Sequence, residues 1–183
     1  MKNLKSIIIT TVILTLICAI STGALAFTNE LTADRIEKLA AEAEQKAMSR
    51  VIVAEDYQKN TVDLNGEHVY YTAKSGGKAV GYIFTVSTHG YGGAVKVMTG
   101  IGTDGKVVAI EVLDASNETP GLGQNVTKKD FWEQFKGQSG ELAVKQEITP
   151  ITSATISSKA VTKCVNEALK LYEAVIKEDG NNG

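Results

Sequence analysis

Apolar residues dominate the first part of the chain, and their spacing changes further along. The run Ile7–Ala26 holds twenty consecutive positions without a charged residue. At about 1.5 Å per residue, a helix of that length crosses a bilayer core of about 30 Å. We therefore expect residues 1–27 to form a short cytoplasmic tip and a transmembrane anchor.

The charges on either side of this run predict its orientation. Lys2 and Lys5 precede it, and the first charged residue after it is Glu30. Because positive residues favour the cytoplasmic side, everything after Phe27 is predicted to lie outside the cytoplasm. Ala24-Leu25-Ala26 fits the cleavage pattern of a signal peptide, but the apolar run exceeds the usual ~7–15 residues of such peptides. We therefore expect a retained single-pass anchor in the cell membrane.

The spacing of apolar residues then becomes weakly helical. Residues 28–48 are polar and rich in Ala and Glu, with only a faint apolar stripe. This composition predicts a solvated stalk helix, which either continues the anchor or follows a short break at Thr28-Asn29. The expected folded domain then covers residues 49–178, and the Gly- and Asn-rich tail 179–183 is expected to be disordered.

Beyond the stalk the pattern alternates, as in strands. Short runs of β-branched and aromatic residues predict strands at 51–53, 68–73, 79–87, 95–101 and 107–113. Hairpin turn signals are found at Asn65-Gly66, Gly76-Gly77 and Asp104-Gly105. The pattern therefore predicts a mostly antiparallel sheet.

Two helices are expected after these strands. Thr127 is a candidate N-cap for residues 128–135, whose Phe131, Trp132 and Phe135 share one face. Residues 156–177 carry apolar side chains every three or four positions, which is typical of a helix packed on a core. The fold class is therefore α+β: one transmembrane helix, then one extracytoplasmic domain with a sheet packed by helices.

Composition excludes several kinds of function. Apart from the two lysines before the anchor, the chain has 17 basic and 21 acidic residues and no basic stripe, which argues against nucleic-acid binding. Cys18 lies in the anchor and Cys164 stands alone in the remaining chain, so no disulfide is expected. His68 and His89 have no partner at metal-ligand spacing, so we expect no metal site.

Two glycine-rich segments interrupt the strand region. The segment 100–105 matches G-x-G-x-x-G, but 106–112 has strand character, whereas a dinucleotide fingerprint has to open a helix. We interpret it as a hairpin turn. Gly90-Tyr91-Gly92-Gly93 has the backbone freedom for a turn and for close approach of a ligand or a strand.

The segment Glu118–Gly123 has the sequence Glu-Thr-Pro-Gly-Leu-Gly. Pro followed by Gly is typical of a type II turn. Such a loop exposes backbone N–H groups and the side chain of Leu122, so it could hold the flat face of an aromatic ligand. Glu118 and Thr119 would then supply polar contacts. A plain turn is the alternative.

Hydroxyl residues cluster where the last helix is expected to begin. Thr152, Ser153, Thr155 and Ser157 exceed the single N-cap that a helix needs. The unpaired N–H groups and the dipole of a helix N-terminus favour an anion. The cluster therefore predicts either a phosphate site or a cap with more hydroxyls than it needs.

In their order and spacing these motifs resemble the FMN-binding domain family, in particular the G subunits of Rnf electron-transport complexes. The resemblance covers the whole chain, from the anchor to the final helix. It implies that a flavin transferase attaches FMN through a phosphoester to Thr155, the last residue of an [S/T]-G-A-[T/S] motif. It further implies two groups of cofactor-binding residues and no catalytic residue. The first group is Thr152, Ser153, Ala154, Thr155 and Ile156, and the second is Glu118, Thr119, Gly121 and Leu122.

This chain departs from the family pattern at two positions. Ser153 occupies the position of the family's Gly. If that position needs a positive φ, a Ser there costs on the order of 1–2 kcal/mol. Thr149, six residues before the acceptor, stands where the family often has Asp.

The resemblance also implies a function. It predicts an electron-transfer subunit whose covalent FMN serves a membrane complex that couples ferredoxin/NAD electron transfer to ion translocation. The enzyme activity would belong to the complex, whose other membrane and peripheral subunits are the expected partners. Three alternatives stay open: the C subunit of a sodium-pumping quinone reductase, a non-redox extracytoplasmic module, and a free-standing flavoprotein.

Overall fold

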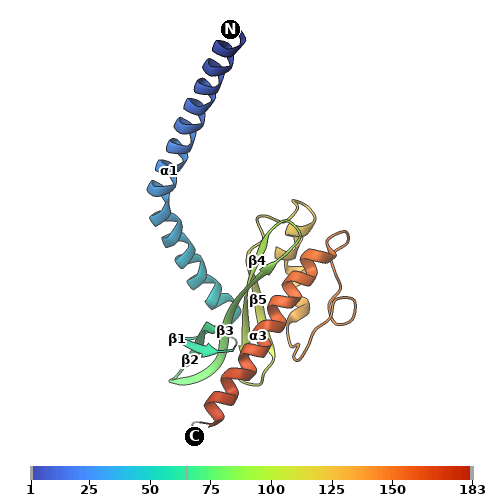
Figure 1. The fold of residues 1–183 in the computed structure, drawn as a ribbon. Helices are drawn as coiled ribbons and strands as arrows, with labels where there is room; N and C mark the ends of the chain where they lie inside the picture. The colour runs from blue at the N-terminus through green and yellow to red at the C-terminus, as the bar shows by residue number, and fades with distance from the viewer. Residues whose placement is uncertain (1, 65, 182–183) are drawn as a thin grey trace. The chain divides into compact units, whose positions relative to one another are not determined.

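The computed structural model describes residues 2–64 and 66–181. Contacts within the chain divide it into two compact units, residues 1–43 and residues 44–183. Helix α1, Lys2–Val51, runs from the first unit into the second (Figure 1). The predicted anchor and stalk are thus parts of one helix, and the alternative with a break at Thr28-Asn29 is wrong.

The first unit consists of a long apolar helix segment. The stretch Leu4–Ala33 is long and apolar enough to cross a membrane, with a mean hydropathy of 2.3. Its threonines do not interrupt the helix, because Thr10, Thr15 and Thr28 each donate to the carbonyl four residues earlier, at 2.8–2.9 Å. Their hydroxyls are therefore satisfied within the helix, as hydrocarbon surroundings require.

The second unit is built on a five-stranded antiparallel sheet. Its strands lie in the order in which they follow one another along the chain, so each pair is joined by a direct connection. They are β1 (Asp56–Asp63), β2 (Glu67–Ser75), β3 (Lys78–His89), β4 (Ala94–Gly102) and β5 (Val107–Asp114). The predicted α+β fold with a mostly antiparallel sheet is confirmed.

The N-terminal edge of the sheet differs from the prediction. The predicted strand 51–53 is wrong, because Val51 ends α1 and Ile52 donates its N–H to the carbonyl of Met48 at 3.0 Å. The first strand is instead β1, which has largely exposed polar side chains. With few apolar residues, β1 lacks the apolar alternation that predicted the other strands.

The turns between strands follow the glycine signals. Gly76, Gly77 and Gly105 all take positive φ, between 56° and 77°, a region that favours glycine. The segment Gly100–Gly105 is the end of β4 and the turn into β5, which confirms the hairpin interpretation and excludes a dinucleotide fingerprint there. The predicted turn at Asn65-Gly66 joins β1 to β2, although Asn65 itself lies outside the described residues.

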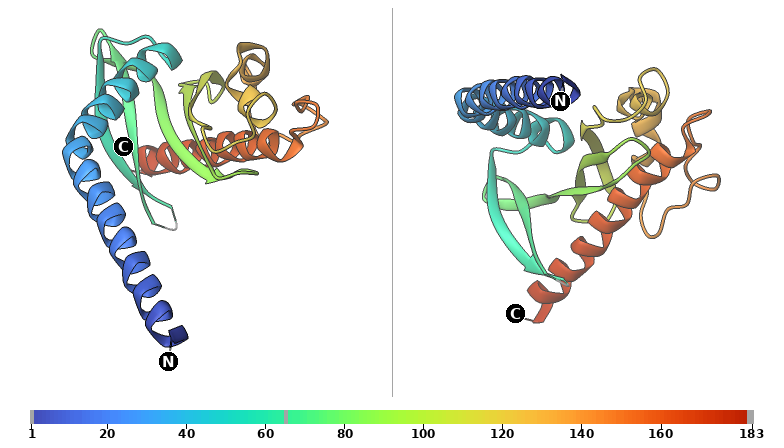
Figure 2. Two further views of the ribbon diagram at one scale, coloured as in Figure 1. Left: turned by 90° about the horizontal axis from the view of Figure 1, so that it is seen from above. Right: turned by 45° about the horizontal axis from the view of Figure 1, so that its top comes forward.

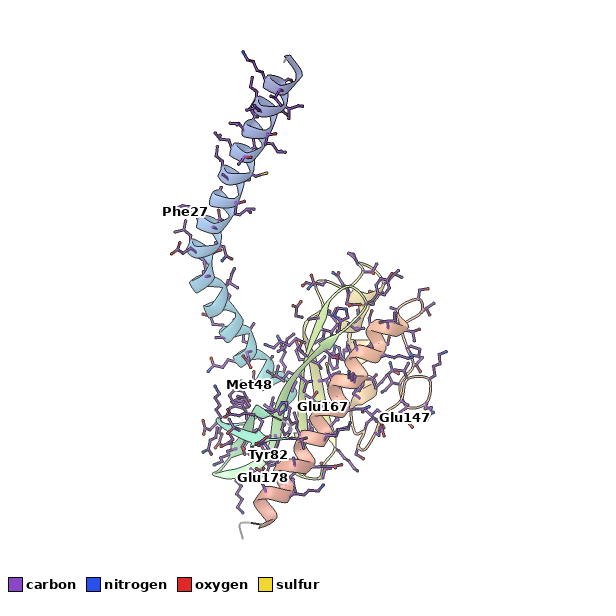
Figure 3. The ribbon with its side chains drawn as sticks, viewed as in Figure 1. Phe27, Met48, Tyr82, Glu147, Glu167 and Glu178 are labelled. Carbon is purple, nitrogen blue, oxygen red and sulfur yellow. The ribbon has the colours of Figure 1, made fainter. Side chains whose placement is uncertain are left out.

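Helix α3, Thr155–Asn181, covers one face of the sheet (Figure 2). The apolar stripe predicted from the sequence includes Val161, Cys164 and Val165, which are fully buried in one core with the side chains of β3 and β4. Tyr82 of β3, labelled in Figure 3, packs edge to face against Tyr172, with the ring centroids 5.5 Å apart. The helix extends past the predicted end of the domain at residue 178, and residues 182–183 lie outside the described part.

The last turns of α1 pack on the other face of the sheet. Ala47, Met48, Val51 and Ile52 form a second core with residues that include Ile83 and Met98 (Figure 3). Two glycines make room for this contact: a Cβ on Gly100 would lie 2.8 Å from Cγ1 of Ile52, and one on Gly81 2.7 Å from its Cδ1. The end of α1 is therefore part of the folded domain.

The predicted helix 128–135 is divided into short pieces. A 3₁₀ turn, η1 (Gly123–Thr127), precedes α2 (Lys129–Trp132), and η2 (Glu133–Phe135) follows. Thr127 is not the N-cap: its hydroxyl donates back to the carbonyl of Gln124 at 2.8 Å, and Lys128 takes the cap position without a side-chain bond. Phe131 and Phe135 are nevertheless buried, as their shared face predicts.

Candidate functional site

Three loops far apart in the sequence enclose a hollow of about 480 Å³ at one end of the sheet. They are the β3–β4 loop, the loop that follows β5, and the start of α3, which carry the three motifs singled out in the sequence. The lining residues are Tyr91, Thr119, Leu122, Gly123, Ser153, Ala154, Thr155, Ile156 and Ser157. The structure therefore brings the predicted motifs together at one site.

The wall of this hollow combines apolar side chains with hydroxyl groups and carries no charge. None of its lining residues carries a formal charge. Tyr91, Leu122 and Ile156 are large apolar residues that keep 67%, 43% and 53% of their surface exposed. Large exposed apolar side chains around a concavity are typical of a ligand site. This hollow suits a flat aromatic ligand.

Thr155 is the first residue of α3 and lines the hollow. It is partly exposed, and its hydroxyl makes no hydrogen bond to any of the described residues. The first N–H groups of an α-helix have no partner within the helix, and the helix dipole favours an anion at that end. Thr155 thus presents an unengaged hydroxyl at a position where the helix N-terminus favours an anion.

The backbone just before α3 is turned by Ser153. This residue takes φ 62°, and Lys145 is the only other described non-glycine residue with a positive φ. The N–H of Ala154 donates to the carbonyl of Ile151 at 3.0 Å, which closes the turn. The position that the family fills with Gly does therefore adopt the left-handed conformation. Ser153 bears the cost of a side chain there.

Two further hydroxyls in the first turn of α3, those of Ser157 and Ser158, have structural partners. The buried hydroxyl of Ser158 accepts from the N–H of Ile151 and donates to the carbonyl of Ala154, both at 3.0 Å. Ser157 donates to the carboxylate of Glu118. The predicted N-cap by a hydroxyl does not occur, because Ala154 directly precedes the helix and Ser158 ties down the turn from within it. No signal in the sequence indicated that Ser158, which lies inside the helix, would hold this turn.

Glu118 lies behind the hollow rather than among the residues that line it. It is 1% exposed, and its Oε1 accepts from the N–H of Gly92 at 3.0 Å. A Cβ on Gly123 would lie 2.8 Å from its Oε2, and one on Gly90 or Gly92 would also collide with Glu118 or its neighbour Asn117. Gly90 and Gly123 therefore make space for a buried carboxylate, and Gly92 makes space for the backbone of Asn117, roles that the sequence did not reveal.

Two other predicted site residues also lie outside the lining. Gly121 takes φ 74°, which fits the predicted type II turn, and its carbonyl accepts from the side chain of Asn125 at 2.7 Å. Thr152 lines a neighbouring hollow of about 310 Å³ together with Thr149. The side-chain amide of Gln134 binds both backbone groups of Thr149, at 2.8 and 3.3 Å. Thr149 is thus held by its backbone.

Comparison with known proteins agrees with this geometry. The FMN-binding domain family matches residues 90–170, and the RnfG N-terminal region matches residues 1–51. The G subunit of the proton-translocating ferredoxin:NAD(+) oxidoreductase complex of Clostridium ljungdahlii is 35% identical, over 92% of this chain and 93% of that protein. The G subunit of the Na(+)-translocating ferredoxin:NAD(+) oxidoreductase complex of Acetobacterium woodii is 37% identical, over 90% of this chain and 91% of that protein.

A solved structure is similar at a lower level. The C subunit of the Na(+)-translocating NADH-quinone reductase of Parabacteroides distasonis has a TM-score of 0.49 and 23% sequence identity. The likeness covers 60% of this chain and 63% of that one.

The hollow, the start of α3 and the match over residues 90–170 define an FMN-binding domain. Its apolar wall and helix N-terminus fit the ring and the phosphate of FMN. The chain belongs to the family of G subunits of ion-translocating ferredoxin:NAD(+) oxidoreductase complexes. The expected resemblance is confirmed, as are FMN as cofactor and a single transmembrane helix among the described residues.

Proposed function

We propose that this chain is the FMN-carrying electron-transfer subunit of a membrane complex that couples electron transfer between ferredoxin and NAD to ion translocation. Its partners are the other subunits of that complex. Relatives that are G subunits of such complexes match over nine-tenths of the chain at 35–37% identity, which favours this role over that of a quinone-reductase C subunit. The chain provides a redox carrier, and the enzyme activity belongs to the assembled complex.

We further propose that the FMN phosphate is esterified to Thr155 by a flavin transferase. The observation that carries this proposal is the unengaged hydroxyl of Thr155 on the first residue of α3, inside the hollow. An ester at this atom leaves the phosphate beside the free N–H groups of the first turn. The hydroxyls of Tyr91, Thr119 and Ser153 in the lining also have no hydrogen bond to described residues, but none of these residues belongs to α3.

The residues of the hollow then have distinct tasks. Leu122, Tyr91 and Ile156 supply apolar surface for the ring, and Thr119 supplies a polar contact. The turn at Ser153 sets the direction in which α3 begins. FMN supplies the redox chemistry when it is bound, whereas the protein orients it and sets its electrostatic surroundings.

In-gel flavin fluorescence after denaturing electrophoresis tests the covalent link. The full chain is co-expressed with a flavin transferase, and we expect a fluorescent band that survives denaturation. Thr155→Ala should remove this fluorescence, whereas Thr152→Ala and Ser153→Gly should keep it. A dark wild-type band with a competent transferase present would disprove the attachment. Loss of fluorescence in Ser153→Gly but not in Thr155→Ala would show that FMN is attached to Ser153 and not to Thr155.

Purification of the protein from its native membrane separates the remaining functional alternatives. A non-redox module would bind no FMN, covalently or otherwise, so the purified native chain would show no flavin absorbance. A free-standing flavoprotein would carry FMN but would not co-purify with other subunits of the complex from the native membrane. We expect both flavin and co-purifying subunits.

We also propose that α1 is a retained anchor with its N-terminus in the cytoplasm and the FMN domain outside. Lys2 and Lys5 before the apolar stretch support this orientation. Retention is supported by the family match over residues 1–51, which continues through the potential cleavage site after Ala26. The N-terminus of membrane-extracted protein is therefore expected to be intact, and a chain that begins at Phe27 would contradict retention.

A further inference from the structure

Glu118 is a buried carboxylate without a cationic partner. Only 1% of its surface is exposed, and no ion pair between described residues involves it. Both of its oxygens instead accept hydrogen bonds, from the N–H of Gly92 and from the hydroxyl of Ser157. Both oxygens are thus engaged by uncharged groups, and neither is paired with a cation.

A buried charge of this kind is costly to the fold. Transfer of an ionised carboxylate out of water is strongly unfavourable unless it is paired, and neutral hydrogen-bond donors compensate only part of the cost. Two glycines, Gly90 and Gly123, leave the space that the carboxylate occupies. The chain thus provides a dedicated place for an unneutralised negative charge. Such a charge next to a ligand site is a candidate for function.

The Glu118 carboxylate lies directly behind residues that line the hollow. Ser157 and Gly123 both line the hollow, Ser157 is hydrogen-bonded to the Glu118 carboxylate, and a Cβ added to Gly123 would lie 2.8 Å from its Oε2. The lining itself contains no charged side chain that could offset it. The N-terminus of α3 contributes only a partial positive charge, equivalent to roughly half a unit. The hollow is therefore under the influence of a nearby negative charge in surroundings that screen it poorly.

We propose that Glu118 lowers the reduction potential of the bound FMN by electrostatic repulsion. This inference rests on the proposed function. Electrons delivered by a reduced redox centre of the complex add negative charge to the flavin whenever fewer protons than electrons are taken up. The fixed charge of Glu118 opposes that gain, and so it favours the oxidised form. Glu118 acts through the field that it creates at the ring and not by contact.

A redox titration of Glu118→Gln tests this role. The full chain, loaded with FMN by a co-expressed transferase and purified in detergent, is titrated with dithionite and mediator dyes while flavin absorbance is recorded. Glutamine has the same shape and can bond to both Gly92 and Ser157, so the variant removes the charge and keeps the contacts. We expect the midpoint potential to rise by at least about 30 mV, a tenfold change in the equilibrium constant of a two-electron couple.

Glu111→Gln is the matched control. Its carboxylate lies in β5 and pairs with Arg50 at 2.9 Å on the face of the sheet that α1 covers. Removal of that charge should leave the midpoint potential unchanged. An equal rise in both variants, or no rise in Glu118→Gln, would overturn the proposal.

Glu118→Asp separates charge from geometry. It keeps the charge but withdraws the carboxylate from Ser157, so we expect a less stable domain whose midpoint stays near that of the wild type. A rise as large as in Glu118→Gln would overturn the proposal. The Asp variant controls for geometry, and the midpoint of the Gln variant decides. Absence of bound FMN from the wild type would instead refute the proposed function, which keeps the two failures distinct.

Discussion

Ser153 bears backbone strain at the point where α3 begins. Its φ of 62° lies in the left-handed region, where an L-residue costs about 1–2 kcal/mol relative to the right-handed one. Its side chain is exposed and forms no hydrogen bond with described residues that would repay this cost. The residue is therefore a site where a substitution can stabilise the protein.

Ser153→Gly should raise the free energy of unfolding by up to about 1 kcal/mol. The gain is smaller than the relieved strain, because glycine also increases the entropy of the unfolded chain. Urea unfolding of the domain, compared at an unchanged m-value, measures the difference. A loss of about 1 kcal/mol or more would show that the Ser153 side chain stabilises the turn.

At the residue scale the sequence predicted positions better than roles. The hydroxyl cluster and the Glu118–Gly123 loop do meet at one hollow, as their motifs imply. The sequence did not predict that Ser158 ties the turn together, or that the buried Glu118 side chain occupies space left by Gly90 and Gly123. Both roles depend on contacts between segments that are remote in the chain. No local spacing reports such contacts.

At the scale of elements, the end of α1 is closely fitted to the sheet. Ile52 lies against Gly81 and Gly100, where added Cβ atoms would come within 2.7–2.8 Å of its side chain. The strand pattern predicted neither this contact nor a helical Val51, because a short apolar run at a helix end looks the same as a buried strand. Val51 is helical because the end of α1 packs on the sheet.

Gly100→Ala should lower the free energy of unfolding by about 1–3 kcal/mol, the usual cost of overpacking. The sign of this change in the free energy of unfolding is informative, because alanine is otherwise favoured over glycine in a strand by roughly 0.5–1 kcal/mol. Chemical denaturation of Gly100→Ala, Ile52→Ala and the double variant measures the coupling. If the losses in free energy of unfolding simply add in the double variant, Ile52 does not pack against Gly100.

Helix α3 buries a thiol that responds to alkaline pH. Burial raises the pKa of Cys164 from 9.0 to about 12. Because the folded-state pKa is the higher one, the thiol's contribution to stability is complete below pH 9 and is lost as the pH rises toward about 12. Other groups titrate in this window, so a variant that lacks the thiol is needed as reference.

Cys164→Ala supplies that reference. The stability advantage of the wild type over this variant should shrink between about pH 8 and about pH 10.5, because only the wild type loses the contribution of the thiol. Denaturant unfolding at both pH values measures the advantage. A constant advantage would mean that Cys164 ionises equally easily in the folded and unfolded states.

For the whole molecule, the apolar run and its flanking lysines define an anchor and predict its orientation. Val53 is a suitable reporter, because it follows α1 in the folded unit and is 86% exposed. In intact cells, Val53→Cys should react with a membrane-impermeant maleimide without permeabilisation. The wild type, with Cys18 and Cys164 as its cysteines, provides the background. Labelling only after permeabilisation would place the FMN domain in the cytoplasm.

The central claim is a phosphoester between FMN and Thr155, and peptide mass spectrometry tests it most directly. Trypsin releases residues 146–159, which include Thr149, Thr152, Ser153, Thr155, Ser157 and Ser158. When the protein has been co-expressed with a flavin transferase, this peptide should carry the mass of one FMN less one water. Fragmentation should place that mass on Thr155. An unmodified peptide, or FMN on any other hydroxyl, would contradict the claim.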